Sequence, residues 1–191
     1  MKEILVATNN KGKLEEIKQI LKDYNLLSLK DIGCKVDVDE DGKTFEENAI
    51  KKAKEISEIT NMPCIADDSG LCIDVLNGWP GVHTARFLGE NATDEDRNNY
   101  ILEKMKNEKN RNAKVVCAIA YFYDDKEIVV TGEIQGKISK EVRGENGFGF
   151  DSIFELERGK TLAELTSKEK NKVSSLSLIH ISEPTRHWAM S

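Results

Sequence analysis

The chain has 191 residues, of which 39% are hydrophobic and 32% charged, and its formal net charge is −6. This length suits one domain, or one domain in two lobes, with a hydrophobic core of ordinary size. The acidic balance argues against a general nucleic-acid binder, and no apolar run approaches membrane-spanning length. A strand pattern starts at once without a secretory signal, so we expect a cytoplasmic protein with no nucleic-acid or membrane partner.

The cysteines and histidines exclude several kinds of site. No two cysteines have C-x-x-C spacing, which favours buried free thiols in a reducing compartment. The four are Cys34, Cys64, Cys72 and Cys117. His83 is the one histidine in the main body of the sequence, which argues against a histidine triad or a histidine-rich zinc site.

The first elements predict a strand, a polar loop and a helix. Residues 4–7 form an apolar run, and residues 8–13 read Thr-Asn-Asn-Lys-Gly-Lys. The helix that follows places Leu14, Ile17, Ile20 and Leu21 on one face. Small polar residues let backbone N–H groups approach an anion, and the helix adds its positive end. The loop lacks the Walker spacing, and an ordinary strand–helix turn is the alternative.

Acidic residues and a second helix come next. Residues 22–43 predict a strand with loops that ends in an acidic run at 37–41. Residues 44–47 form a capping box that predicts a helix start, and Asn48 and Lys52 border its apolar stripe. The stripe consists of Phe45, Ala49, Ala53 and Ile56.

The run Asp67-Asp68-Ser69-Gly70 follows a short apolar strand at residues 63–66 and predicts an acidic corner at a strand end. Magnesium takes one or two carboxylates together with substrate phosphates. The candidate acids are Asp39, Glu40, Glu47, Asp67 and Asp68. A turn with solvated acids is the alternative interpretation.

The second half predicts a helix from residue 93 to about 107, a strand at 114–123 and a hairpin into 128–131. Helices alternate with strands around one hairpin, which predicts an α/β fold with a mixed sheet. The glycine-rich run at 147–151 allows a backbone wall against which a flat base lies. Its candidate contacts are Phe148 or Phe150 for stacking and Asp151 for a hydrogen bond, and a glycine-hinged loop with a core aromatic is the alternative. Lys11 and Lys13 add charge to the first loop. Further candidate phosphate partners are Lys52, Arg86 and Lys170, which could also be ordinary solvated charges.

Six motifs then occur in order, at residues 8–13, 44–49, 66–71, 80–86, 147–151 and 169–170. Together they resemble the Ham1 or inosine triphosphate pyrophosphatase family from about residue 1 to residue 174. The resemblance implies a two-lobed α/β fold with a mixed sheet, flanking helices and a central nucleotide cleft, usually as a homodimer. It implies Mg²⁺-dependent hydrolysis of ITP, dITP and XTP to the monophosphate and pyrophosphate.

The resemblance also implies roles for individual residues. Asp68 would be the catalytic proton acceptor and a metal ligand, with Asp39 or Glu40 as a further metal ligand. Substrate contacts would come from Thr8, Asn9, Asn10, Lys11, Gly12, Lys13, Ser69, Phe148, Gly149, Phe150, Asp151 and Lys170.

The end of the chain departs from the family. The family continues into a Ser-His-Arg motif, whereas Ser174 is followed here by Ser175 and Leu176. We therefore divide the sequence into a pyrophosphatase domain at 1–174 and an atypical tail at 175–191 that looks like a frameshift or cloning scar. Alternatives are a nucleotide-binding protein with impaired or no catalysis, a phosphatase with an aspartyl nucleophile, and a Maf-type pyrophosphatase.

Overall fold

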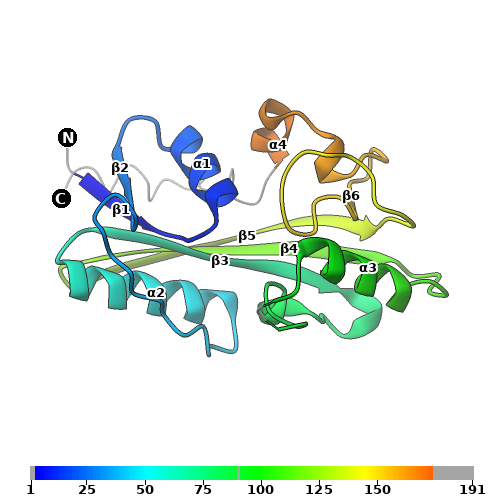
Figure 1. The fold of residues 1–191 in the computed structure, drawn as a ribbon, viewed down its shortest axis with the longest axis horizontal. Helices are drawn as coiled ribbons and strands as arrows, with labels where there is room; N and C mark the ends of the chain where they lie inside the picture. The colour runs from blue at the N-terminus through cyan, green and yellow to red at the C-terminus, as the bar shows by residue number, and fades with distance from the viewer. Residues whose placement is uncertain (1–2, 90, 174–191) are drawn as a thin grey trace. The chain divides into compact units, whose positions relative to one another are not determined.

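A computed structural model describes residues 3–89 and 91–173 (Figure 1). Its α-helices are α1 (Lys11–Ile20), α2 (Phe45–Thr60), α3 (Asp94–Lys104) and α4 (Ser167–Val173). Its strands are β1 (Glu3–Ala7), β2 (Asn25–Ser28), β3 (Cys64–Ile73), β4 (Asn112–Tyr123), β5 (Lys126–Ile138) and β6 (Phe154–Glu155). The predicted tail lies outside the described residues.

The strands form one mixed sheet in the order β2-β1-β3-β4-β5-β6. β1 pairs in parallel with β2 and with β3, whereas β6 pairs antiparallel with β5. The sheet therefore contains both parallel and antiparallel strand pairs, and helices pack beside it. This confirms the predicted α/β class with a mixed sheet.

The chain forms two compact units, which are described separately. Unit 1 contains residues 3–68 and 117–132, and unit 2 contains residues 69–116 and 133–173. Strands β3, β4 and β5 each contribute residues to both units.

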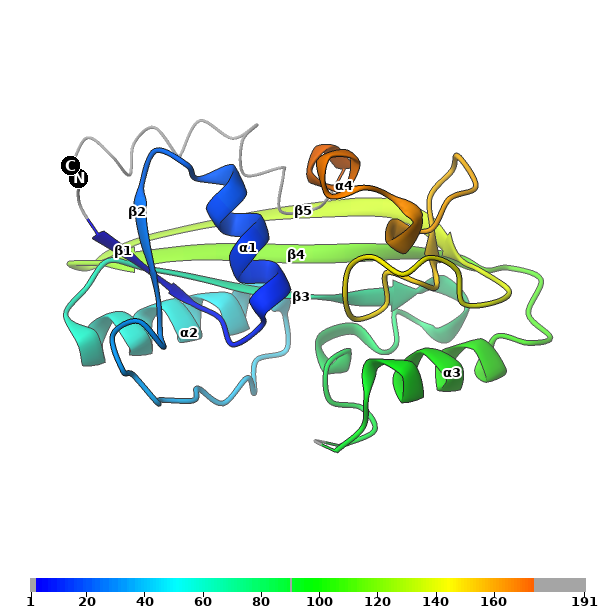
Figure 2. The same ribbon diagram turned by 45° about the horizontal axis from the view of Figure 1, so that its top comes forward.

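In unit 1, α1 and α2 lie on opposite sides of the strands (Figures 1 and 2). Ile4 and Val6 of β1 cluster with Ile65 of β3 and with Ile17 of α1. Since successive strand residues point to opposite faces, Leu5, which is fully buried, points to the α2 side. The two helices therefore cover two different faces of the same strands.

The predicted start of α2 is confirmed. Thr44 is the N-cap, its hydroxyl accepts from the Glu47 N–H, and the Glu47 carboxylate accepts from the Thr44 N–H. This reciprocal pair satisfies N–H groups that have no partner inside the helix. The predicted stripe is buried throughout: Phe45, Ala49, Ala53 and Ile56.

The β4–β5 hairpin is also confirmed, but its second strand is longer than predicted. Asp124 and Asp125 form the two-residue turn with φ angles of 51° and 57°, the backbone that such a turn requires. β5 continues to Ile138 with alternating exposed and half-buried side chains. After Thr131 the exposed positions are the polar residues Glu133, Gln135 and Lys137, so the hydrophobic pattern there was too weak to predict the strand.

Unit 2 has its own hydrophobic core. Ile101 of α3 and Met105, which caps the end of that helix, pack with Leu71 and Ile73 of β3 and with Phe154 of β6. α3 begins at the predicted capping box, and it ends at Lys104 rather than near residue 107. Within the described ranges, no helix is long and apolar enough to cross a membrane.

All four cysteines are free, as predicted, but only Cys64 and Cys117 are buried, whereas Cys34 and Cys72 are half-buried. Cys64 is fully buried in β3, and burial raises the pKa of its thiol from 9.0 to about 12. Between pH 9 and pH 12 the thiol of the unfolded chain loses its proton, whereas the thiol of the folded chain keeps it. The stability contributed by the neutral thiol is therefore complete below pH 9 and is lost as pH rises toward 12.

This shift predicts a pH-dependent difference between the wild type and Cys64→Ala. The substitution adds a constant packing penalty, but it removes the thiol titration. The stability advantage of the wild type should therefore shrink by about 2 kcal/mol between pH 8 and pH 10.5. Urea unfolding at both pH values measures it, and an advantage that stays constant would contradict the buried neutral thiol.

Candidate functional site

Asp67 and Asp68 lie inside β3 and not after a strand, so the predicted acidic corner is wrong. The sequence predicted that the strand ends before Asp67, with a turn as the alternative, but both carboxylates are strand residues and are buried, at 1% and 6% exposure. Adjacent strand residues point to opposite faces of a sheet. The two carboxylates therefore enter two different environments, one beside α1 and the other beside α2.

On the α1 side, the buried Asp67 forms an ion pair with the half-buried Lys13. Its Oδ2 lies 2.7 Å from Nζ of Lys13, in the first turn of α1. Burial lowers the pKa of Lys13, but the charge and hydrogen bond of Asp67 outweigh it and raise this pKa overall. Lys13 therefore stays charged, and Asp67 anchors it.

On the α2 side, Asn48 contacts Asp68. Asn48 is 1% exposed, and its Nδ2 donates to Asp68 Oδ2 at 2.8 Å. Its Oδ1 accepts from the backbone N–H of Gly42 at 2.7 Å, which fixes the orientation of the amide. A Cβ at Gly42 would lie 2.6 Å from that oxygen, so only glycine allows the contact. Asn48 thus joins Asp68 to the end of the acidic segment.

Sequence reasoning noticed Asn48 only as a border of the α2 stripe. The available signal was its spacing, because it follows Phe45 by three residues and therefore shares the buried face. A buried amide needs hydrogen-bond partners, which makes such a position a candidate for holding another polar group.

Burial raises the pKa of Asp68, and the charge of Glu40 adds to this shift. The Asn48 hydrogen bond and the charges of Lys52 and Lys13 oppose it. A carboxylate whose pKa is raised toward neutrality is a better proton acceptor than an ordinary one. The raised pKa makes Asp68 a candidate general base.

Lys52 lies between the acidic segment and β3. Its Nζ forms an ion pair with Glu40 and donates to the backbone carbonyl of Asp67 at 2.9 Å. Glu40 is half-buried, whereas Asp39 is exposed. Glu47 serves as the helix cap described above. The arrangement therefore favours Glu40 over Asp39 as the second carboxylate beside Asp68.

A metal site here would use two carboxylates. In the part of the chain that the structure describes, no group of three or more His, Cys, Asp or Glu residues gathers around a common point. Magnesium needs only one or two carboxylates when substrate phosphates complete its coordination. The pair Glu40 and Asp68 fits that requirement.

The predicted phosphate loop is partly a helix start. Lys11 begins α1, and Asn10 is its N-cap, whose Oδ1 accepts from the N–H groups of Gly12 at 2.9 Å and Lys13 at 3.2 Å. Thr8 Oγ1 accepts from the Asn10 N–H at 3.2 Å. Two of the N–H groups expected to face an anion therefore bind Asn10, while Asn9, Asn10 and Lys11 are exposed.

In unit 2, the predicted residues around position 150 form a second cluster. Asp151 and Lys170 are buried, and Asp151 Oδ2 lies 2.7 Å from Lys170 Nζ. The same oxygen accepts from the Phe148 N–H at 2.9 Å. Burial raises the pKa of Asp151, and the charge of Lys170 opposes this shift. A Cβ at Gly147 would lie 2.1 Å from Asp151 Oδ2, which requires glycine there.

The two aromatic candidates differ. Phe150 packs edge-on against Phe154 with ring centroids 6.5 Å apart and belongs to the core of unit 2. Phe148 is half-buried, and Lys170 Nζ lies 4.2 Å from its ring centroid. Phe148 is therefore the better stacking candidate. Ser69 is half-buried in the unit 2 part of β3.

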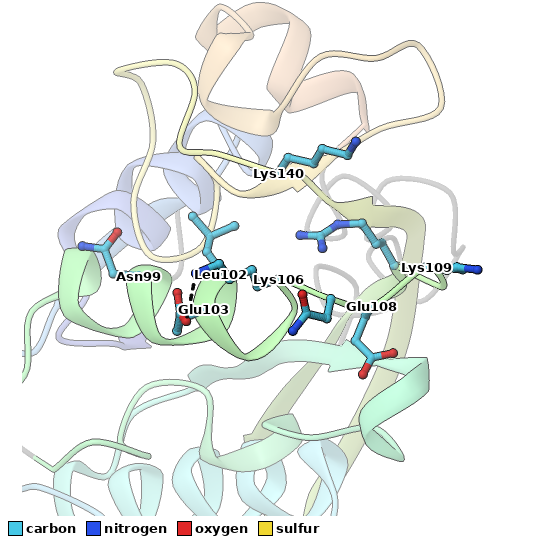
Figure 3. Close-up of a pocket in the computed structure, with 9 residues that line it drawn as sticks. Asn99, Leu102, Glu103, Lys106, Glu108, Lys109 and Lys140 are labelled. Atoms are coloured by element: carbon cyan, nitrogen blue, oxygen red, sulfur yellow. Dashed lines mark hydrogen bonds and ion pairs between the residues drawn. The ribbon is translucent and has the colours of Figure 1, made fainter.

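A pocket of about 830 Å³ in unit 2 contains none of the predicted site residues (Figure 3). It is lined by Asn99, Leu102, Glu103, Lys106, Asn107, Glu108, Lys109, Arg111 and Lys140. Arg111 donates to the carbonyls of Ile138 at 2.7 Å and Ser139 at 2.5 Å, and also to that of Met105. Its guanidinium therefore ties the end of α3 to β5, which is a structural role.

The two clusters define the class of protein. Unit 1 offers Asp68 with a raised pKa, a second carboxylate and two lysines, a set that suits a divalent cation and phosphate oxygens. Unit 2 offers an aromatic ring beside a buried Asp–Lys pair, which suits a flat base. These features are those of an α/β enzyme that hydrolyses phosphate anhydrides.

The chain belongs to the Ham1 family, whose model matches residues 4–177. It is 46% identical over 186 residues to a dITP/XTP pyrophosphatase of Clostridium perfringens, with 91% of each chain covered. It is 47% identical over 180 residues to a dITP/XTP pyrophosphatase of Geobacter sulfurreducens, covering 91% of this chain and 90% of the relative.

Solved structures agree with this assignment. The Staphylococcus aureus Ham1 protein matches with a TM-score of 0.84 at 39% identity, over 94% of this chain and 97% of that one. A HAM1 protein from Coxiella burnetii matches with a TM-score of 0.84 at 37% identity, over 95% and 98%. The predicted family and fold are thereby confirmed.

Proposed function

We propose that this chain hydrolyses non-canonical purine nucleoside triphosphates (ITP, dITP and XTP) to the monophosphate and pyrophosphate, with Mg²⁺. The observation that carries the proposal is the buried Asp68, whose pKa is raised beside Glu40 and Lys52. Membership of the Ham1 family and the names of the relatives support the substrate class.

We assign different parts of the substrate to the two clusters. In unit 1, Lys13 and Lys52 supply positive charge for the triphosphate, since both are held in place by carboxylates. In unit 2, the Phe148 ring supplies a stacking surface, and Lys170 with Asp151 supplies polar contacts for the base.

In the proposed reaction, Asp68 accepts a proton from the water that attacks the α-phosphorus. The water oxygen bonds to that phosphorus, and the bond from the α-phosphorus to the bridging oxygen breaks. Pyrophosphate leaves with that electron pair, while Lys13 and Lys52 stabilise its growing charge. Mg²⁺ held by Asp68 and Glu40 would neutralise triphosphate charge when bound.

An aspartyl nucleophile is a weaker alternative. Asp67 is 1% exposed and paired with Lys13, so it is not available to attack a phosphate. An aspartyl-phosphate route would release orthophosphate from the triphosphate, which distinguishes it from the proposed reaction.

A second candidate is nucleotide binding with impaired turnover. Ser175 and Leu176 stand where the family has His and Arg, side chains that donate hydrogen bonds. A polar site that loses its donors loses discrimination between bases.

Residues 1–174 form the proposed catalytic domain, and a cytoplasmic homodimer is the proposed state.

A substrate panel tests the proposal. Pyrophosphate release is measured with dITP, XTP, dATP and dGTP, with Mg²⁺ or with a chelator, on this chain and on Ser175→His/Leu176→Arg. We expect Mg²⁺-dependent release from dITP and XTP, with stronger rejection of dATP and dGTP in the double variant. Tight dITP binding without release from this chain, together with release from the double variant, would favour the second candidate.

A further inference from the structure

The run Gly147–Asp151, called here the base loop, is held at its centre by α3. The Gly149 N–H donates to Asp94 Oδ2 at 2.8 Å. The Gly149 carbonyl accepts from Asn98 Nδ2 at 2.8 Å, and the same nitrogen lies 3.2 Å from Ser152 Oγ. Both backbone polar groups of Gly149 are therefore bound by side chains of one helix.

The sequence of α3 makes this contact possible. Thr93 and Asp96 form the capping box, so Asp94 is not needed to cap the helix. Asp94 and Asn98 are four residues apart and share one helix face. Asn98 is 5% exposed, and burial of its amide requires partners, which Gly149 provides.

The base loop depends on unusual backbone geometry at this point. Gly149 has φ of +60°, a left-handed conformation that glycine adopts without steric penalty but that an unconstrained glycine also leaves easily. Two hydrogen bonds from a packed helix remove that freedom. The adjacent residue, Phe148, is also fixed, because its backbone N–H donates a hydrogen bond to Asp151 Oδ2.

We propose that α3 is a clamp that holds the base loop in its binding conformation, with Asp94 and Asn98 as positioning residues for the nucleobase. This rests on the proposed function, because it assumes that the Phe148 ring receives the base. The N–H groups of Phe148 and Gly149 and the Gly149 carbonyl already have partners. The N–H groups of Phe148 and Gly149 are therefore not available to the base, and the loop recognises it through the Phe148 ring and side chains.

Hydrogen exchange tests the clamp without any ligand. In Asp94→Ala, the Gly149 amide should exchange on the order of tenfold faster, because it loses its acceptor. Asp94→Asn keeps an acceptor oxygen and should restore most of the protection. Glu95→Ala is the matched control, since it removes an exposed acid from the same helical turn that forms no hydrogen bond or ion pair with the described base loop. Equal exchange in Asp94→Ala and the wild type would overturn the clamp.

Ligand-binding measurements test the role of the α3 clamp in binding the nucleobase. Calorimetry with Mg²⁺ compares IMP, which carries the base, with inorganic triphosphate, which does not. Asp94→Ala and Asn98→Ala should each weaken IMP roughly tenfold and leave inorganic triphosphate unchanged, whereas Glu95→Ala should change neither. Equal weakening of both ligands, or none, would reject the positioning role.

The two ligands also separate this inference from the proposed function. If the wild type binds neither IMP nor inorganic triphosphate, the proposed function fails, whatever the exchange data show. If the wild type binds both and the α3 variants bind IMP as tightly, the inference fails and the proposed function stands.

Discussion

Asp68→Asn should lower pyrophosphate release from dITP by roughly 10²–10⁴-fold, with a much smaller change in KM, because the variant loses its proton acceptor. The amide oxygen can still accept from Asn48 Nδ2, so the local structure should persist. Steady-state kinetics with circular dichroism measures both effects. Turnover near that of the wild type would remove Asp68 from the reaction.

Two neighbouring acids provide controls for this result. Glu40→Gln should also reduce turnover, and its defect should be partly relieved by a higher Mg²⁺ concentration if Glu40 is a metal ligand. Asp39→Asn removes an exposed acid of the same segment and should leave turnover close to that of the wild type. The reverse order of effects would assign the second metal ligand to Asp39.

The second large effect concerns stability. Lys13→Met should destabilise the protein by about 3 kcal/mol, because it leaves the charge of Asp67 buried without a partner. Lys13→Met/Asp67→Asn removes both charges and should regain most of that stability. Urea unfolding of the wild type, both single variants and the double variant gives the coupling free energy between the two side chains.

Catalysis should not follow stability in this series. The double variant still lacks the positive charge proposed to hold the triphosphate, so its affinity for inorganic triphosphate should stay low. A stable Lys13→Met variant would reject the stabilising role of the pair. A double variant with normal triphosphate affinity would reject the role of Lys13 in triphosphate binding.

Local features of the fold were predictable from sequence. The capping boxes at Thr44 and Thr93 act within four residues, so the residue types alone indicate where α2 and α3 begin. The strand β1 and the β4–β5 hairpin have strong apolar patterns. The second half of β5 has an exposed face with polar residues, so its pattern resembles that of a loop.

The candidate site was predictable as a set of residues but not as an arrangement. Physical reasoning on the sequence could not distinguish Asp67 from Asp68, because they are adjacent acids, and only the family resemblance selected Asp68. The strand separates them, and partners from α1 and α2 give them different roles. Those partners, Lys13 and Asn48, are distant in sequence, so no local pattern distinguishes the two carboxylates.

The same limit applies to the base loop. Phe148 and Phe150 both stood next to glycines, and only packing against Phe154 assigns Phe150 to the core. The partners of Gly149 come from Asp94 and Asn98, more than fifty residues earlier in the chain. Tertiary contacts of this kind decide which polar groups remain for a ligand.

The most direct test of the central claim is hydrolysis of dITP with Mg²⁺ in water enriched in heavy oxygen, with mass spectrometry of both products. Attack at the α-phosphorus by water next to Asp68 predicts the heavy atom in the nucleoside monophosphate and unlabelled pyrophosphate. Label in the pyrophosphate, or release of orthophosphate and a diphosphate, would contradict the account.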